Sequence, residues 1–184
     1  MQLRNSSQHY GAIAMALHWV VLVLIAFAWL TGEFHDAFPN GAPRDAAMFA
    51  HMTLGLSIVA LAVARLCWRM ADPPPPAEKS SLGQWADWAA HAVHYVIYAL
   101  LFAIPALGIV ALFARGKALS IFGLFEIASP WAADRAFAHS MTEVHELLVN
   151  CLLILVALHA AAALLHHYVL KDRTLLRMMP ESRA

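Results

Sequence analysis

Four stretches of apolar sequence, each long enough to cross a lipid bilayer, constrain this chain more than any other feature. They are Ala12–Leu30, Ala47–Leu66, Ala89–Phe113 and Val144–Tyr168. A transmembrane helix needs about 20 predominantly apolar residues. Only 13% of the 184 residues are charged, whereas about a quarter would be in a soluble protein. We therefore expect one all-α domain over residues 1–184, an integral membrane four-helix bundle.

Lysine and arginine are distributed unevenly between the two ends of such a bundle. With four spans, the termini and the linker after the second span share one side. That side holds eight of these residues: Arg4, Arg65, Arg69, Lys79, Lys171, Arg173, Arg177 and Arg183. The two opposite loops hold four: Arg44, Arg115, Lys117 and Arg135. Because cytoplasmic loops carry an excess of positive residues, we expect both termini in the cytoplasm.

The connections and the third span contain few features that suggest chemistry. Four consecutive prolines, Pro73–Pro76, predict a stiff extended linker. Pro105 should kink the third span. Residues 114–140 form the longest loop, and its aromatic residues Phe122, Phe125 and Trp131 predict a position at the membrane interface.

The two cysteines are not expected to form a site. Cys67 and Cys151 fall in different halves of the membrane, which argues against a disulfide, and two thiols alone make a poor metal site. The histidines are left as the candidate functional groups.

Four histidines lie inside the apolar stretches. His18 is in the first span, His51 begins the second, and His145 and His159 are fourteen residues apart in the fourth. That spacing places His145 and His159 on one helical face, about 21 Å apart along the axis. Because successive spans alternate in direction, His18 matches His159 in depth and His51 matches His145. Two such pairs predict two b-type haems inside the bundle, each with two histidine ligands.

Two other interpretations of these histidines are weaker. Intramembrane histidines can simply form hydrogen bonds between helices, but these four match in depth two by two. A non-haem metal site would need three or four ligands at one depth. Ala14 and Gly55, each four positions from a proposed ligand, leave room for a porphyrin against the helix.

Further polar residues gather at the expected cytoplasmic end. His91 and His94 open the third span, His166 and His167 close the fourth, and Lys171 follows. They can hold haem propionates or a quinone headgroup, or they can be interfacial side chains that reach for water. The remaining histidines are assigned to the surface (His9 and His35) and to the entrance of the fourth span (His139).

Several sequence elements together match a known pattern. They are Leu17-His18-Trp19, His51, His91-Ala92-Val93-His94, Val144-His145-Glu146-Leu147, Leu158–Tyr168 and Lys171–Pro180. On these elements the chain resembles the bacterial cytochrome b561 family of small dihaem membrane proteins, along nearly its whole length. The histidine layout alone also occurs in the cytochrome b subunits of membrane hydrogenases and formate dehydrogenases. The tail is more specific and is similar to that of superoxide oxidases in the family.

This resemblance implies cofactors, a reaction and a location. His18 with His159, and His51 with His145, would be the axial ligands of two haems b. The implied activity is superoxide:ubiquinone oxidoreductase in the bacterial inner membrane. Superoxide and ubiquinone would be its small-molecule partners, with no nucleic acid and no required protein partner.

The site of superoxide entry is harder to predict. The outer loops hold four cations that can steer an anion toward the outer haem: Arg44, Arg115, Lys117 and Arg135. Arg115 and Lys117, which flank Gly116 just beyond the third span, are the favoured pair. The same loops hold five carboxylates (Glu33, Asp36, Asp45, Glu126 and Asp134), so these cations are equally interpreted as solvated loop residues. Two rival functions stay open: an electron-carrying subunit fed by a dehydrogenase, and a non-redox membrane transporter or scaffold.

Overall fold

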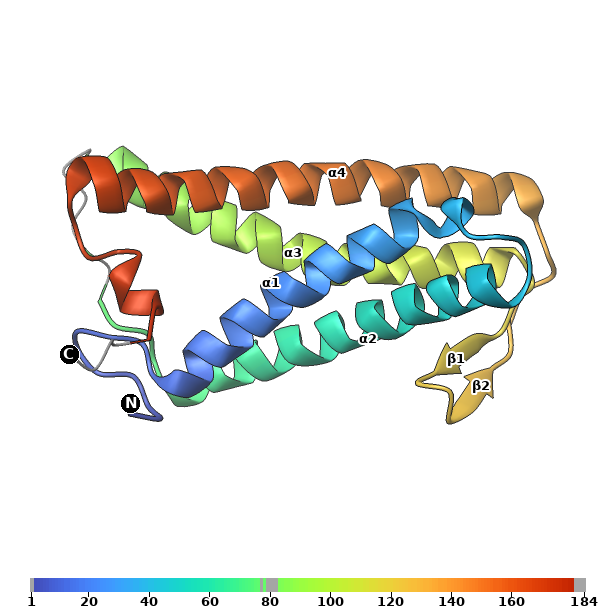
Figure 1. Cartoon of the computed structure of the whole chain (residues 1–184), viewed down its shortest axis with the longest axis horizontal. Coiled ribbons are helices and arrows are strands. Elements are labelled where there is room, and N and C mark those ends of the chain that lie inside the picture. The colour runs from blue at the N-terminus through green and yellow to red at the C-terminus, as the bar shows by residue number, and fades with distance from the viewer. Residues whose placement is uncertain (1, 77, 79–82, 181–184) are drawn as a thin grey trace.

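Four long antiparallel helices make up most of the computed structural model, which describes residues 2–76, 78 and 83–180 (Figure 1). They are α1 (Ala12–Glu33), α2 (Ala42–Ala71), α3 (Gln84–Ala114) and α4 (Arg135–Leu165). Each of the four is long and apolar enough to cross a membrane. The chain is therefore a multi-pass membrane protein. Lys79 and Arg183, which contribute to the expected charge bias, lie outside the described residues.

Most helix ends lie beyond the predicted apolar spans, because polar residues continue the helical hydrogen bonding. One exception is the end of α4 at Leu165, where a π-helical turn, His166–Leu170, replaces the predicted α-helix. Helix α2 begins at Ala42, with Pro43 in its first turn, where its missing N–H is not needed. Helix α4 begins after Asp134, whose Oδ1 accepts a hydrogen bond of 3.0 Å from the Phe137 backbone N–H. Helix α3 continues through Pro105.

The long loop contains a small β-hairpin, which the all-α expectation missed. Strands β1 (Leu119–Ile121) and β2 (Phe125–Ile127) pair antiparallel, with Ser120 opposite Glu126. Its turn places Phe122 and Gly123 at positive φ, a conformation that hairpin turns favour. Phe122 and Phe125 are both exposed, as a position at the membrane interface requires. The segment was predicted to be a loop without strands, and the two strands form around this turn.

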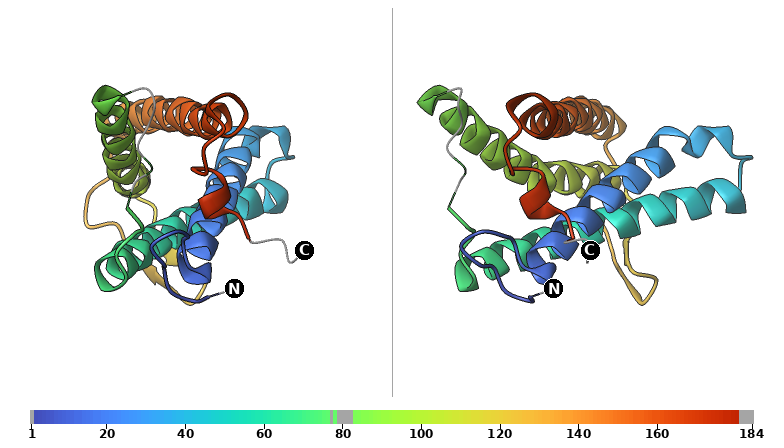
Figure 2. Two further views of the ribbon diagram at one scale, coloured as in Figure 1. Left: turned by 90° about the vertical axis from the view of Figure 1, so that its left-hand side faces the viewer. Right: turned by 60° about the vertical axis from the view of Figure 1, so that its left-hand side comes forward.

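The four helices are organised as two helical hairpins. Helix α1 packs along α2, and α3 packs along α4, whereas contacts between α2 and α3 are far fewer (Figures 1 and 2). Buried apolar residues from all four helices form the core: Val21, Ile25, Ala28, Ile58, Ala62, Leu100, Leu101, Ile104 and Leu152. In each helix these residues lie at the middle, and the intramembrane histidines lie toward the ends.

Both chain termini lie at one end of the bundle and the β-hairpin lies at the other (Figure 1). We call these the termini end and the hairpin end. At the termini end the buried side chain of Arg177 donates hydrogen bonds to the carbonyls of Gln8 (2.9 Å) and Pro76 (2.8 Å). Trp19 Nε1 donates to the Met178 carbonyl at 2.9 Å. These bonds tie the C-terminal tail to the N-terminal segment and the proline linker.

Candidate functional site

The four intramembrane histidines form two pairs, one toward each end of the bundle. His51 and His145 form the hairpin-end pair, with ring centroids 6.1 Å apart and ring planes at 69°. His18 and His159 form the termini-end pair, with centroids 6.2 Å apart and planes at 67°. In each pair one ring comes from the α1–α2 hairpin and the other from α4. These are the partners that the depth of each residue in the sequence predicts.

The separation of the rings fits a metal ion held between them. A metal–imidazole bond is about 2 Å long, so two such bonds in line place the ring centroids about 6 Å apart. A direct hydrogen bond between two imidazoles would bring them closer. Among the described residues, no group of three or more histidine, cysteine or acidic side chains is arranged to hold a metal ion. The donor set therefore suits a metal that brings its own equatorial ligands, as haem iron does.

Backbone carbonyls orient both rings of the hairpin-end pair. His51 Nδ1 donates to the Ala28 carbonyl in α1, and His145 Nδ1 donates to the Ile104 carbonyl in α3, each at 2.8 Å. Such a bond fixes the tautomer and directs Nε2 toward the partner ring. The tautomers follow from the bonds and are not seen directly. Both Nε2 atoms are thereby free to act as ligands.

A glycine makes room for each of these two bonds. Gly32 lies four residues after Ala28, and a Cβ there would stand 2.8 Å from Cε1 and Nδ1 of His51. Gly108 lies four residues after Ile104, and a Cβ there would stand 3.3 Å from Cε1 of His145. Glycine thus allows close approach of ring to backbone at both positions. This role of the two glycines was not predicted from the sequence, although a glycine inside an apolar helix often indicates a close approach of another group.

A cavity of about 550 Å³ opens around the hairpin-end pair. This volume is in the usual range for small-molecule sites. Apolar residues of the core line much of the cavity. Polar and charged residues also line it: Glu33, His35, His51, Arg115, Thr142, His145, Glu146 and Asn150. Gly55 also lines it, and a Cβ there would meet nothing within 4 Å. His35, expected at the surface, is in fact half-buried at this cavity.

The termini-end pair has different surroundings. The His94 ring lies against His159, with centroids 5.0 Å apart. His18 Nδ1 is buried and has no hydrogen-bond partner among the residues that the structure describes. Three histidines thus gather at this end, but the backbone carbonyl that orients each ring at the hairpin end has no counterpart for His18.

The other predicted residues at the termini end are dispersed. His91 Nδ1 donates to the Asp87 carbonyl of its own helix at 2.7 Å, the His167 ring packs on Tyr168, and Lys171 is exposed with positive φ. Within the described residues, no hydrogen bond or ring contact joins these three side chains to His18 or His159.

His166 belongs to a separate arrangement. It begins a π-helical turn, His166–Leu170, and its Nδ1 lies 2.5 Å from Oδ2 of Asp172. Burial opposes ionisation of Asp172, but hydrogen bonds from His166 and from the Thr174 backbone N–H outweigh it and hold the pKa of this carboxyl below its ordinary value. Asp172 was not singled out by the sequence, because its partner is brought near only by the turn.

Three of the four predicted steering cations differ in their surroundings, and the fourth, Arg135, is the first residue of α4. Arg115 lines the large cavity and donates to Thr142 Oγ1 at 2.9 Å. Lys117 is exposed two residues further on. Arg44 forms an ion pair of 3.0 Å with Asp36 and donates to the carbonyls of Asp36 and Phe38. Both cysteines are free, as expected.

Comparison with known proteins identifies relatives along the whole chain. A family model described as prokaryotic cytochrome b561 matches residues 9–181. A probable superoxide oxidase CybB of Yersinia pestis is 38% identical, covering 95% of this chain and 97% of the relative. Cytochrome b561 homologs 1 and 2 of Escherichia coli K12 are 35% and 32% identical, covering 91% and 99% of this chain and 94% and 97% of their own lengths.

Proposed function

The chain belongs to the prokaryotic cytochrome b561 family, and from this premise we propose that it is a superoxide oxidase of the bacterial inner membrane. As a family member it is a b-type cytochrome that transfers electrons. In the proposed reaction, two superoxide ions are oxidised to two molecules of oxygen, and ubiquinone takes up the two electrons and two protons to become ubiquinol. Superoxide reacts at the hairpin end, on the periplasmic side, and ubiquinone at the termini end, on the cytoplasmic side.

The observation that carries this proposal is that one bundle holds two pairs of histidines, one toward each end. His51 with His145, and His18 with His159, stand at metal-bridging separation. When bound, two haems b would supply one-electron transfer between the two sides of the membrane. Each pair would supply two histidine ligands to its haem, and outer-sphere electron transfer to or from such a haem would need no further ligand position.

The residues around the large cavity support superoxide as the donor. Arg115 lines the cavity and Lys117 is exposed nearby, so both can attract a small anion toward the hairpin-end pair. Arg44 is closely paired with Asp36, and we assign it to holding its loop, where it contributes less to attraction. The similarity to a probable superoxide oxidase points to the same donor.

The residues at the termini end support a quinone there. His94 lies beside the histidine pair, and the His166–Asp172 pair offers a proton donor at the membrane interface. His91, His167 and Lys171 complete the set of candidate polar groups at this end.

The alternative is an electron carrier that receives electrons from a redox partner and delivers them to the quinone pool. The relatives named only as cytochrome b561 homologs favour it. Both functions use the same two histidine pairs, so the donor decides between them.

A reduced-minus-oxidised spectrum of the purified protein, recorded with a superoxide generator and with haem quantified, tests the proposal. We expect two haems b per chain that superoxide reduces and ubiquinone reoxidises. Two haems that stay oxidised in superoxide would favour the partner-fed carrier. One haem per chain would contradict the assignment of one histidine pair.

A further inference from the structure

Arg65, in the last two turns of α2, has no partner of opposite charge among the described residues. Its side chain is half-buried, with the guanidinium carbon 5.8 Å from the centroid of the Tyr98 ring. In the described part of the chain, no carboxylate forms an ion pair with it. A charge inside a membrane protein is costly unless it is paired. Contact with an aromatic ring offsets a small part of that cost.

Arg65 also lies at the depth of the termini-end pair. At the other end of α2, His51 is level with Ala28 and Gly32 of α1. Because α1 and α2 are antiparallel, moving fourteen residues along α2 brings Arg65 level with His18, within the turn.

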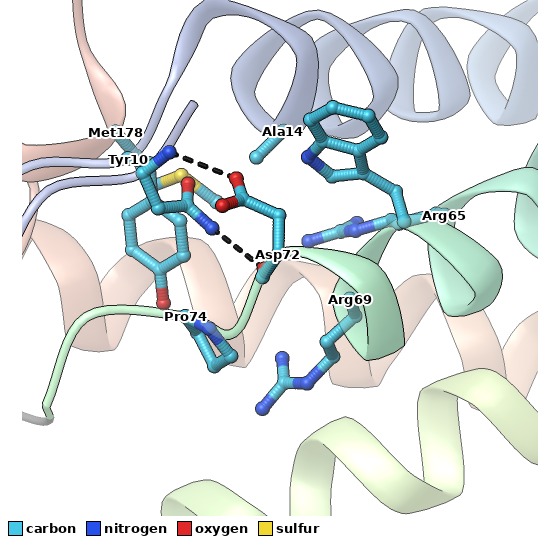
Figure 3. A pocket seen from close by; sticks show the side chains of 9 residues that line it. Tyr10, Ala14, Arg65, Arg69, Asp72, Pro74 and Met178 are labelled. Atoms are coloured by element: carbon cyan, nitrogen blue, oxygen red, sulfur yellow. Dashed lines mark hydrogen bonds between the residues drawn. The ribbon is translucent and has the colours of Figure 1, made fainter. Parts of the chain in front are cut away.

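Hydrogen-bond donors without acceptors surround Arg65. Within the described part of the chain, the buried atoms Trp68 Nε1, Tyr98 Oη and His18 Nδ1 have no hydrogen-bond partner. Asp72, which directly follows α2, instead accepts a bond of 2.8 Å from the Asn5 backbone N–H (Figure 3). Leaving buried polar groups unmatched costs about 1–3 kcal/mol each. A missing acceptor with negative charge would satisfy these groups together.

The hairpin-end pair has no such cation. Its charged neighbours at the cavity are Glu33, Glu146 and Arg115, and Arg115 donates to Thr142. The charged residues near the two pairs therefore differ in sign. Near the termini-end pair lies Arg65, for which the described residues supply no carboxylate, whereas near the hairpin-end pair lie two carboxylates and one hydrogen-bonded arginine.

We propose that Arg65 binds a propionate of the haem held by His18 and His159 and raises the reduction potential of that haem above the potential of the other. This inference rests on the two-haem reading above and deepens it. A nearby positive charge stabilises the reduced haem, which carries one positive charge less than the oxidised haem. Arg65 thereby sets the direction of electron flow, from the hairpin end to the termini end.

Redox titration of the purified holoprotein tests this proposal, and it requires neither superoxide nor quinone. The two haems are distinguished by the spectra of His18→Ala and His51→Ala proteins. In Arg65→Gln, we expect the reduction potential of the termini-end haem to fall by at least 59 mV. For a one-electron couple this is a tenfold change in the equilibrium constant of reduction. The potential of the hairpin-end haem should stay unchanged.

Arg69→Gln is the matched control, since Arg69 lies one turn further along α2 and is exposed. It should shift the potential much less. An Arg65→Gln protein with both haems and unchanged potentials would overturn the proposal. If Arg65→Gln loses the termini-end haem, Arg65→Lys should restore both the haem and its potential, because the charge is retained. Failure of Arg65→Lys to do so would equally overturn it.

Failure of the proposed function gives different results. A wild-type protein with one haem per chain would refute the two-haem reading, whereas two haems that ignore superoxide would refute only the donor. Both results are seen in the wild-type protein, so they are distinguished from an unchanged reduction potential in Arg65→Gln, which would refute only the role of Arg65.

Discussion

The two histidine pairs have nearly the same ring geometry, but the protein supports them in different ways. At the hairpin end, backbone carbonyls orient both rings, and glycines make room for them. At the termini end, neither a hydrogen-bond partner for His18 Nδ1 nor a carboxylate partner for Arg65 is found among residues 2–76, 78 and 83–180, and His94 lies close by. The hairpin-end pair is preorganised by the backbone, and the termini-end pair is surrounded by charge and polar side chains. The difference suggests that the first site is built to hold its cofactor in fixed geometry, and the second to tune its cofactor and exchange protons.

Removal of a ligand should have the largest effect and should separate the sites completely. In His145→Ala, we expect loss of the hairpin-end haem alone, and in His159→Ala loss of the termini-end haem alone, because each ring serves a different pair. Haem content and reduced-minus-oxidised spectra measure this. Either variant with two haems and the wild-type spectrum would remove the basis of the comparison.

Addition of a methyl group at the glycines should sharpen the comparison. Gly32→Ala places a Cβ 2.8 Å from the His51 ring, and Gly108→Ala places one 3.3 Å from the His145 ring. We expect Gly32→Ala to weaken hairpin-end haem binding more, by about tenfold or more, as for loss of other orienting contacts to a ligand. The termini-end haem in the same protein is the internal control. Equal loss of both haems would indicate general misfolding.

Neutralisation of the outer cations should change a rate and leave haem content intact. Arg115→Gln and Lys117→Gln should each slow reduction by superoxide several-fold at low ionic strength and weaken its dependence on salt, because attraction over a distance is screened by ions. Stopped-flow reduction at several salt concentrations measures this, with Arg4→Gln, an exposed cation at the opposite end of the bundle, as the control. An unchanged salt dependence in both variants would argue against steering by these residues.

The smallest effect is expected at the His166–Asp172 pair. The hydrogen bonds to Asp172 lower the pKa of its carboxyl, so they stabilise the tail above the ordinary aspartate pKa and lose that effect as pH falls through the lowered value. Asp172→Asn should therefore destabilise the turn by about 1 kcal/mol near neutral pH and by less in acid. Amide hydrogen exchange of residues 166–178 measures this.

A matched control for this last variant is Glu143→Gln. Glu143 pairs with His139 across one helical turn, but both side chains are far more exposed than those of His166 and Asp172. Exposed pairs contribute little to stability, so local exchange should hardly change. A larger effect in Glu143→Gln than in Asp172→Asn would contradict this ranking.

The sequence predicted the histidine pairs more fully than it predicted their surroundings. The partners followed from helix direction and from a fourteen-residue spacing, both of which are properties of the backbone. Gly32 and Gly108 were missed because their purpose depends on a ring contributed by another helix. Arg65 was counted only as a cytoplasmic charge, since hydropathy cannot tell a residue in the headgroup region from one beside a cofactor. The β-hairpin was missed because three-residue strands are too short to show alternation.

The division into two helical hairpins has a consequence for the biogenesis of the protein. Each histidine pair joins the α1–α2 hairpin to α4, yet the two hairpins pack on each other much less than their own helices do. A cofactor bound between the two hairpins would hold them together. Because a ligand that binds only the assembled protein stabilises it more at higher ligand concentration, assembly would depend on the supply of the cofactor. Scarcity of the cofactor would then leave two separately inserted halves that membrane proteases can recognise. Protein without its cofactor would then be degraded whether or not it could transfer electrons.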